Sequence, residues 1–527
     1  MADAVHAPPR PTVGRPATGS MTGVPWHPAA HLESSRVSTP RPAAVIVLAA
    51  GEGTRMKSTT PKVLHPIGGV TLVGHAIRAA RATGAEHVGV VVRHGRDRVV
   101  ALCTSLDPDL VFADQDDVKG TGRAVECGLL ALPDDLRGTV LVTYGDVPLL
   151  TGDTLIQLTR AHAESGSAVS VVTARLADPT GYGRIVRDAD GRVEKIVEQK
   201  DATEAERAIT EINSGIYAFE ADVLRDALAH VGTDNAQGEK YITDTIAIAR
   251  AAGHPVRAHV LDDLWQTEGV NDRVQLAALG RELNRRVCEQ HMRSGVTIVD
   301  PATTWIDVDV SIGQDTTVLP GSQLLGATTI GTDAVIGPEV TLTDTEVGDG
   351  AQVTRAVTNL ASIGPGATVG PYSYLRPGTR LGAGGKIGGF VETKNADIGD
   401  GAKVPHLTYA GDVTIGEGAN IGAGTIFANY DGVAKHHSTV GRHSFVGSQT
   451  VVVSPVNVGD GAYVGAGSAL TDDVEPGQIA VARGRQRNID GWVARARAGT
   501  KTAAAAEAAA ARHPETEQPT TPEGHDL

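Results

Sequence analysis

Two basic residues follow a glycine-rich segment near the start of the chain, and together they could bind a phosphate group. The segment runs Leu48-Ala-Ala-Gly51-Glu-Gly53-Thr-Arg55-Met, and Lys62 follows Arg55 by seven residues. Closely spaced glycines after a strand let backbone N–H groups approach an anion, and the two side chains would add positive charge. The segment is neither the Gly-x-Gly-x-x-Gly motif nor a P-loop. Taken alone, such a segment is more often an ordinary tight turn than a phosphate site.

A second group of polar residues lies in the last third of the chain, which is otherwise rich in aliphatic residues and glycine. His406 is accompanied there by Arg376, Lys394, Tyr409 and Asn420. A lone histidine is by default a surface or hydrogen-bonded residue, because histidine has many such roles. A parallel-strand region that needs only Ile, Val, Leu and Gly has no structural use for this set. We therefore predict a functional site around His406.

The elements that must position the glycine-rich segment alternate between strand-like and helix-like runs. The strand-like runs, apolar or β-branched nearly throughout, are residues 43–50, 87–92, 139–146 and 168–176. Residues 71–84 have the pattern of a helix between them. Such alternation predicts a parallel sheet covered on both faces, with ligands beyond the carboxyl ends of its strands. Farther on, residues 273–293 place Leu276, Leu279, Leu283 and Val287 on one stripe, which predicts a connecting helix.

From about residue 311, apolar residues recur every six positions. One register holds Ile363, Val369, Leu375, Leu381 and Ile387; another holds Val440, Val446, Val452, Val458, Val464 and Leu470; a third holds Ile330, Ile336 and Leu342. Many are followed by glycine, namely Gly331, Gly337, Gly364, Gly370, Gly382, Gly388, Gly441, Gly447, Gly459 and Gly465. This is the hexapeptide signature of a parallel β-helix, and we expect these glycines to turn its corners at positive φ. A loop must leave the coil at residues 429–439, where the register breaks.

Composition excludes several other classes of protein. The net charge of −15 argues against a binder of nucleic-acid backbones, and 3% aromatic residues argue against stacking platforms. The distant Cys103, Cys127 and Cys288 indicate neither a zinc site nor a disulfide framework. No apolar run is long enough for a membrane span or a signal peptide. We expect a cytoplasmic protein with disordered tails, a transient helix through the alanines after residue 501, and a start at Met1 or Met21.

The combination LAAGxGTRM…PK resembles the signature of the sugar nucleotidylyltransferases. Further segments match that family in order, at Gln115, Gly120-Thr121-Gly122, Tyr144-Gly145-Asp146, Gly181-Tyr182-Gly183-Arg184-Ile185, Glu198, Glu211–Gly215 and Gly269-Val270-Asn271. The resemblance implies that Asp146 and Asn271 hold Mg²⁺ and that Arg55 is catalytic. It implies binding of UTP and the sugar nucleotide by Leu48, Ala49, Ala50, Gly51, Lys62, Gln115, Gly120, Thr121, Tyr144, Gly145, Asp146, Gly183, Glu198, Asn213 and Asn271. Gly51, Gly53, Gly120 and Gly122 would let the backbone approach the nucleotide.

The His406 region resembles the acetyltransferase half of the bacterial bifunctional N-acetylglucosamine-1-phosphate uridyltransferase/glucosamine-1-phosphate N-acetyltransferase family, and the match covers residues 43–495. It implies a left-handed β-helix and a homotrimer, with acetyl-CoA between neighbouring helices and His406 as general base. The sugar phosphate would be bound by Arg376, Lys394, Tyr409, Asn420 and Lys435. Acetyl-CoA would be bound by Ala423, Asn429, Tyr430, Ser448, Ala466 and Arg483. No cysteine lies between residues 301 and 484, which excludes a cysteine thioester there and favours direct attack of the sugar amine.

We therefore predict an enzyme of small-molecule substrates that acetylates glucosamine 1-phosphate and then couples the product to UTP, supplying UDP-N-acetylglucosamine for peptidoglycan. The predicted parts are a tail (1–41), a Rossmann-like nucleotidyltransferase domain (42–272), a helical linker (273–300), the β-helix domain (301–484) and a second tail (485–527). One alternative is a nucleotidylyltransferase whose β-helix serves only assembly or regulation, but an inert helix would not need His406, Asn429 and Arg483 together. A second, a scaffold without catalysis, would not need Arg55 or Lys62.

Three positions depart from the family pattern. Gly389 stands where the family usually has Asn, Val118-Lys119 precede Gly120 in place of a more regular segment, and Pro405 precedes His406. Gly389 puts a side-chain contact in question, and Val118-Lys119 put the details of base reading in question. Pro405 puts the local backbone in question, because proline fixes its φ. None removes a residue to which chemistry is assigned.

Overall fold

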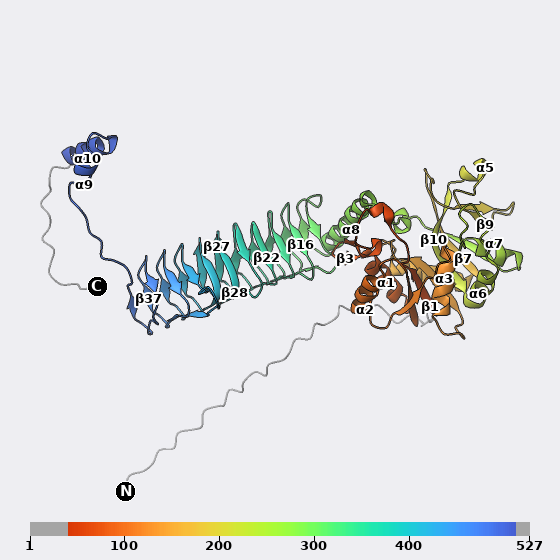
Figure 1. Ribbon diagram of the computed structural model, residues 1–527, viewed down its shortest axis with the longest axis horizontal. Coiled ribbons are helices and arrows are strands. Elements are labelled where there is room, and N and C mark those ends of the chain that lie inside the picture. The colour runs from red at the N-terminus through yellow and green to blue at the C-terminus, as the bar shows by residue number, and fades with distance from the viewer. Residues whose placement is uncertain (1–39, 513–527) are drawn as a thin grey trace, which may run out of the picture. The chain divides into compact units, whose positions relative to one another are not determined.

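The computed structural model describes residues 40–512 of the chain. The predicted tail up to residue 39 and the residues after 512 lie outside the described residues. An α/β region comes first, followed by a long series of short parallel strands (Figure 1).

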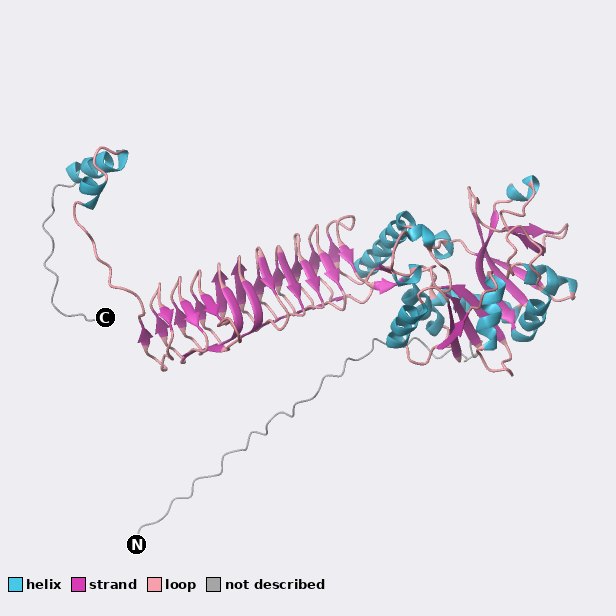
Figure 2. Ribbon diagram, viewed as in Figure 1, coloured by secondary structure: helices cyan, strands magenta, loops and turns pink. Residues whose placement is uncertain are grey.

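The α/β region is built on a nine-stranded sheet with helices on its faces (Figure 2). The strand order is β11-β7-β10-β6-β1-β4-β5, and β8 and β9 extend the sheet beside β10. These strands are β1 (Ala44–Leu48), β4 (His87–Val92), β5 (Val111–Asp114), β6 (Thr139–Tyr144), β7 (Val169–Arg175), β8 (Arg184–Arg187), β9 (Val193–Val197), β10 (Glu211–Glu220) and β11 (Val256–Val260). A separate small hairpin pairs β2 (Pro66–Ile67) with β3 (Val70–Thr71).

Both faces of this sheet are covered by helices, because strand β1 is apolar at every position and must be buried on both sides. Val45 and Val47 belong to the core shared with α1, α2 and α4, whereas Ile46 and Leu48 belong to the core shared with α3, α6 and α7. The helices are α1 (Leu72–Ala82), α2 (Arg96–Leu106), α3 (Thr121–Leu130), α4 (Gly152–Glu164), α5 (Glu204–Arg207), α6 (Ala221–His230) and α7 (Asp244–Ala251), with the short 3-10 turns η1 (Thr54–Met56), η2 (Lys62–Leu64) and η3 (Leu264–Thr267). The helix predicted at residues 71–84 is confirmed as α1.

The expectation of a wholly parallel sheet is wrong at β10. Strands β6, β1, β4 and β5 are parallel, as is the pair β7–β11, but β10 runs antiparallel to both β6 and β7. A parallel neighbour needs a crossover connection. After β7 the chain instead forms the β8–β9 hairpin and, with only the one-turn helix α5, returns directly into the sheet.

The second region is a β-helix, in the architecture expected from the six-residue period. One sheet holds β12 (Thr297–Ile298), β15 (Thr317–Val318), β18 (Val335–Ile336), β21 (Gln352–Val353), β24 (Thr368–Val369), β27 (Lys386–Gly389), β29 (Lys403–His406), β31 (Asn420–Ile421), β34 (Phe445–Val446), β37 (Tyr463–Val464) and β39 (Ile479–Ala480). The other holds β13 (Trp305–Ile306), β14 (Ser311–Ile312), β16 (Gln323–Leu325), β17 (Thr329–Ile330), β19 (Thr341–Thr343), β20 (Glu346–Val347), β22 (Ala356–Asn359), β23 (Ser362–Ile363), β25 (Ser373–Leu375), β26 (Arg380–Leu381), β28 (Glu392–Ile398), β30 (Tyr409–Ile415), β32 (Ile426–Ala428), β33 (Ser438–Val440), β35 (Val451–Val453), β36 (Asn457–Val458) and β38 (Ala469–Leu470).

Each coil of this helix has three faces. The larger sheet contains two interleaved series of strands, which alternate along the chain and join in β28 and β30. These two long strands bend around a corner at Asn395 and Asp412, whose φ angles are positive. Ile363 pairs with Leu381 in the next coil, so one coil spans three six-residue units.

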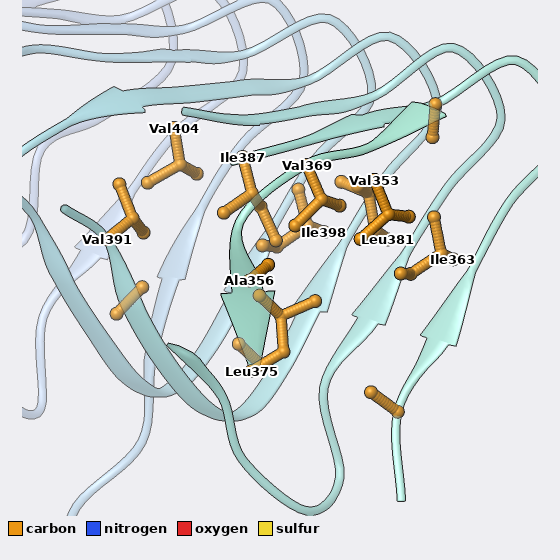
Figure 3. Packing of buried hydrophobic residues seen from close by; sticks show 14 of the residues in the cluster. Val353, Ala356, Ile363, Val369, Leu375, Leu381, Ile387, Val391, Ile398 and Val404 are labelled. Carbon is orange, nitrogen blue, oxygen red and sulfur yellow. The ribbon is translucent and has the colours of Figure 1, made fainter. Parts of the chain in front are cut away.

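The predicted apolar registers form the core of the β-helix. Ile363, Leu375, Ile387 and their equivalents from neighbouring coils are almost fully buried and stack along its interior (Figure 3). Every residue of the three registers belongs to this one cluster. The hexapeptide interpretation is thereby confirmed.

The role expected for the glycines needs correction. Of the ten glycines named above, only Gly337 and Gly370 have positive φ. At Gly364, a Cβ would lie 2.7 Å from the backbone N of Ala383 in the next coil, and most of the others are confined in the same way. These glycines are therefore required by close contact between coils. Positive φ occurs instead two residues later, for example at Gly366, which has open space around it.

The connecting helix is confirmed as α8 (Arg273–Arg293). Leu279 is buried in a core of the α/β region, while Cys288 is buried in the core of the β-helix. Asn284 donates to the carbonyl of Thr304 at 2.8 Å and accepts from the N–H of Ile306 at 2.9 Å. The helix thus packs against both regions through its own side chains.

Two further helices, α9 (Trp492–Ala496) and α10 (Lys501–Arg512), follow the β-helix. Helix α10 contains the alanine-rich stretch for which we expected a transient helix. None of the helices between residues 40 and 512 combines the length and the apolar character that crossing a membrane requires.

Candidate active sites

A cavity of about 430 Å³ lies at the carboxyl ends of β1, β4 and β6. Ten residues predicted to bind the nucleotide line it: Leu48, Ala49, Ala50, Gly51, Lys62, Gln115, Gly120, Thr121, Tyr144 and Asp146. They come from separate parts of the sequence and meet because parallel strands end at one edge of the sheet. We call this space the nucleotide cavity.

A second cavity, of about 420 Å³, adjoins the first. Arg55 and Asn271 line it, and it shares Tyr144 and Asp146 with the nucleotide cavity. The loop of residues 180–182 forms another part of its wall. We call this space the sugar cavity, because Gly181 and Tyr182 of that loop belong to the segment at residues 181–185, which resembles a sugar-contacting segment of the sugar nucleotidylyltransferases.

Lys62, Asp146 and Asn271 meet between the two cavities. The ammonium group of Lys62 forms an ion pair with the carboxylate of Asp146 and lies 3.4 Å from the amide oxygen Oδ1 of Asn271. The carboxylate oxygen of Asp146 and the amide oxygen of Asn271 therefore both contact the same cation, the Lys62 ammonium. One carboxylate and one amide oxygen are hard ligands of the kind Mg²⁺ accepts, with phosphate oxygens and water as the rest. The donor set thus fits the predicted metal.

The glycines around the nucleotide cavity have packing reasons of their own. A Cβ on Gly53 would lie 2.6 Å from Cβ of Lys62, and one on Gly120 would lie 2.2 Å from the carbonyl oxygen of Lys240. Gly122 is held in the same way and donates its N–H to that carbonyl at 2.7 Å. Among the four glycines expected to approach a nucleotide, only Gly51 has open space around it.

Four predicted residues line neither cavity: Gly145, Gly183, Glu198 and Asn213. The side chain of Asn213 bonds to the hydroxyl of Tyr217 at 2.8 Å and to the N–H of Gly215 at 3.0 Å. Glu198 accepts from Thr243 at 3.2 Å, and burial raises its pKa. A Cβ on Gly183 would lie 3.5 Å from Cβ of Asn213 and 3.6 Å from Oε1 of Glu198. Three of the four thus form one group.

His406 begins a column of predicted residues on the β-helix. Its carbonyl accepts from the N–H of Gly424 at 3.1 Å, and in the following coils Gln449 donates to Ala423 at 2.7 Å and Gly467 donates to Ser448 at 2.8 Å. Arg483 then reaches back to the carbonyl of Ala466 at 2.9 Å. The chain therefore stacks His406, Ala423, Ser448, Ala466 and Arg483 along one corner of successive coils.

The residues predicted to hold the sugar phosphate lie on the adjoining face and its far corner. Tyr409 pairs with Glu392 of the preceding coil, and Glu392 accepts from Arg376 at 2.9 Å. The neighbouring ammonium of Lys435 lowers the pKa of Lys394. Two like charges held together in this way favour an anion between them. Asn420 lies apart, on the face that holds β31 and β29.

The loop that leaves the coil is anchored through Asn429. Its amide donates to Asp412, and Asn395 donates to the same carboxylate at 2.9 Å. Burial works against the charged form of Asp412, but these bonds outweigh it and lower its pKa. Tyr430 pairs with Lys435 across the loop and is exposed. The loop thus brings Lys435 to the sugar-phosphate residues.

Comparison with known proteins finds one matching family model and many similar curated proteins. A family model described as the MobA-like NTP transferase domain matches residues 45–215. The protein named "Bifunctional protein GlmU" of Kineococcus radiotolerans is 60% identical over 468 residues, which cover 89% of this chain and 95% of that protein. Proteins of the same name from Mycolicibacterium gilvum (59% over 470 residues, 88% and 94%) and Corynebacterium jeikeium (56% over 482 residues, 91% and 98%) are similar over the same extent. The chain belongs to the GlmU family.

Membership in the GlmU family decides between the alternatives. The chain is a bifunctional enzyme of UDP-N-acetylglucosamine synthesis, with uridyltransferase and acetyltransferase activities. A single-activity enzyme with a non-catalytic β-helix is not favoured.

The departures from the GlmU pattern can now be placed. Gly389 is the strand partner of His406 in the preceding coil, and a Cβ there would make only ordinary contact, 3.5 Å from the carbonyl of Pro371. A Cβ at this position, beside His406, would therefore meet no close contact. Pro405 is accommodated within β29. Val118 and Gly120 both accept, through their carbonyls, from the amide of Gln115, at 3.1 and 3.2 Å.

Sequence reasoning missed some residues of the nucleotide cavity. Arg93, His94, Lys119 and Glu239 also line it. Arg93 and His94 directly follow β4, so their place after a predicted parallel strand was a usable signal. Glu239 comes from a loop without a motif and gave none.

A larger cavity, about 580 Å³, lies away from both sites, beside β8 and β11, and no residue predicted to be functional lines it. Arg187 and Arg250 contribute to its wall, but their guanidinium groups are paired with Glu211 and Asp188. Ion pairing explains these arginines without a ligand.

Proposed function

We propose that uridylyl transfer takes place where the nucleotide and sugar cavities meet. UTP would occupy the nucleotide cavity and N-acetylglucosamine 1-phosphate the sugar cavity, so that a phosphate oxygen of the sugar attacks the α-phosphorus in line and pyrophosphate leaves. The protein's part is positioning and charge neutralisation. Arg55 and Lys62, one beside each cavity, would neutralise the charge that grows toward pyrophosphate. The convergence of Lys62, Asp146 and Asn271 is the observation that best supports this assignment.

Asp146 and Asn271 would hold Mg²⁺. When bound, the ion would neutralise phosphate charge and orient the triphosphate. Lys62 would then exchange its contact with Asp146 for one with a phosphate group, a change that a flexible lysine side chain permits.

We infer that acetyl transfer takes place along the His406 corner. His406 would take a proton from the amine of glucosamine 1-phosphate as the amine attacks the thioester carbonyl of acetyl-CoA, and CoA leaves as the thiolate. Arg376, Lys394 and Lys435 would hold the sugar phosphate, with Tyr409 and Asn420 assisting. Ala423, Ser448, Ala466 and Arg483, together with Asn429 and Tyr430, would bind acetyl-CoA.

A homotrimer is the assembly that we propose for the β-helix. Large apolar side chains such as Tyr372, Phe390 and Phe445 are exposed on it, at 57%, 62% and 40% of their surface. Neighbouring copies would cover these side chains and complete the acetyl-CoA site. We also propose the cytoplasm as the location and the five-part division stated above as the domain organisation.

The test supplies glucosamine 1-phosphate, acetyl-CoA, UTP and Mg²⁺, omits each in turn, and follows the products by mass spectrometry. We expect acetylated sugar phosphate without UTP, and the UDP-sugar only when UTP and Mg²⁺ are both present. Absence of acetylated product under every condition would contradict the proposed acetyl site.

A further inference from the structure

Arg184, at the start of β8, is the most deeply buried arginine near the sugar cavity, with only 1% of its surface exposed. Its guanidinium donates to the carbonyl of Tyr182 and, at 2.6 Å, to the side-chain oxygen of Gln199. Both acceptors are neutral, and Nε has no partner among the described residues. Between residues 40 and 512, no carboxylate forms an ion pair with this group, although the charge of Asp178 is near enough to raise its pKa and so offsets part of the effect of burial.

Arg187, at the other end of the same strand, shows the contrast. It forms a two-point ion pair with Glu211, at 2.8 and 2.5 Å, and its side chain is 31% exposed. Burying a cation that has no ion-pair partner is costly, and the more distant Asp178 offsets only part of that cost. Burial accordingly lowers the pKa of Arg184. The stability of β8 alone gives no reason to keep a cation at this position.

The contacts of Arg184 converge on the loop that lines the sugar cavity. Thr180, Gly181 and Tyr182 form part of the cavity wall. The side-chain oxygen of Gln199 accepts from Arg184 and also, at 3.3 Å, from the N–H of Gly181. Arg184 therefore holds the loop directly at the Tyr182 carbonyl and, through Gln199, at the N–H of Gly181.

On the far side of the loop, the hydroxyl of Tyr182 donates to Glu268 at 3.1 Å. The loop is thus held from both sides, by Arg184 beneath and by Glu268 next to Gly269 and Asn271, which line the same cavity. A shift of the loop would change the shape of the sugar cavity while leaving the nucleotide cavity, which it does not line, unchanged.

We propose that Arg184 is a positioning residue for the sugar 1-phosphate: it holds residues 180–182 in the shape that receives the sugar. This rests on the proposed function of the sugar cavity. Lysine would keep the charge, but its single ammonium lacks the forked geometry that reaches Tyr182 and Gln199 together.

The test compares Arg184→Lys, Arg184→Met and Gln199→Ala with the matched control Arg175→Lys, an exposed arginine at the end of β7. The full-length enzyme is used, and KM for the sugar phosphate, KM for UTP, kcat, Tm and the rate of acetyl transfer are measured. For Arg184→Lys we expect KM for the sugar phosphate to rise between about tenfold and a hundredfold. KM for UTP and the rate of acetyl transfer should stay within about twofold of the parent values. The reason is that the loop at residues 180–182 does not line the nucleotide cavity.

Gln199→Ala should give a smaller rise, and its combination with Arg184→Lys should be less than multiplicative, because both changes release the same loop. Sugar-phosphate KM values for Arg184→Lys that equal those of Arg175→Lys would overturn the proposal. The proposal would also be overturned if Arg184→Lys raised KM for the sugar phosphate and KM for UTP equally and lowered Tm, because that result indicates a purely structural role. If Arg184→Met does not fold, the sugar-phosphate KM values of Arg184→Lys and Gln199→Ala still test the proposal. A parent enzyme without uridylyl transfer would instead refute the proposed function.

Discussion

Lys62 and Asp146 lie 84 residues apart in the sequence and form an ion pair at the point where the nucleotide and sugar cavities meet. Lys62 stands in the short turn η2, and Asp146 follows the end of β6. Their side chains are only 11% and 17% exposed, so the charges interact more strongly than a surface pair would. The pair therefore keeps both groups in place before substrate arrives, with Asn271 beside them.

Replacing Asp146 by Asn should abolish uridylyl transfer. The change keeps the size of the side chain but removes the negative charge that would attract the proposed Mg²⁺ and that pairs with Lys62. A metal acting on phosphate oxygens contributes several kcal/mol, so we expect a loss of at least about a hundredfold in kcat/KM. The measurement is Mg²⁺-dependent release of pyrophosphate.

Acetyl transfer by the same Asp146→Asn protein supplies an internal control for folding. A second control is Asp135→Asn, which changes the same chemical group at an exposed position that lines neither cavity. We expect both to retain acetyl transfer. A near-normal Mg²⁺-dependent rate in Asp146→Asn would refute the metal assignment.

Much of this site could be predicted because its residues follow strands that the sequence marks clearly. Residues 43–50 and 139–146 are apolar or β-branched nearly throughout, so the positions of Gly51 and Asp146 at one edge of the sheet followed from elementary topology. The contact between Lys62 and Asp146 could not be predicted in this way. Lys62 stands in a 3-10 turn whose place depends on tertiary packing, for which no local pattern exists.

Two errors show where local patterns fail. Strand β10 begins with polar residues and contains Gly215, so it lacks the apolar pattern of its neighbours and its direction was not foreseen. The glycines of the β-helix were assigned to corners because glycine's freedom at positive φ is its best-known property. Their actual reason, contact with the next coil, depends on residues of another coil that a six-residue period does not reveal.

Glu198 should make stability depend on pH. Burial raises its pKa in the folded protein, so between its unfolded and folded pKa values the folded state binds more protons. Stability therefore falls as pH rises through that window and stays reduced above it. Glu198→Gln removes the charge, and we expect its Tm to exceed that of the parent at pH 8 but not at pH 4.

The matched control is Glu194→Gln, an exposed glutamate on β9, the strand that Glu198 directly follows. Its Tm should follow that of the parent across the pH range. Parallel Tm curves for Glu198→Gln and the parent protein would show that burial does not disfavour the charged form of Glu198.

Alanine substitutions can separate the two roles of glycine in the β-helix. Gly364→Ala would place a Cβ 2.7 Å from the backbone of the next coil, whereas Gly366→Ala meets no atom within 4 Å but has a φ of +63°. Overpacking costs about 1–3 kcal/mol, and more where backbone must move, while alanine in the left-handed region costs about 1–2 kcal/mol. We expect the larger drop in urea midpoint for Gly364→Ala. A larger drop for Gly366→Ala would instead indicate that glycine at positive φ in the corners matters more than close contact between coils.

His406→Ala should remove acetyl transfer and leave uridylyl transfer intact. General base catalysis contributes about 10²–10⁴-fold, so kcat for acetylation of glucosamine 1-phosphate should fall by that amount, measured as release of free CoA thiol. The control is His443→Ala, which removes an exposed histidine on the same β-helix at a corner where the N–H of residue 443 donates to the carbonyl of Glu417. It should retain acetyl transfer, since this corner does not carry the His406 column.

Because His406 lies in a separate region from Lys62 and Asp146, a loss of uridylyl transfer in His406→Ala would indicate a folding defect. Full activity at both sites would require another base, and the assignment of the His406 corner would then be wrong.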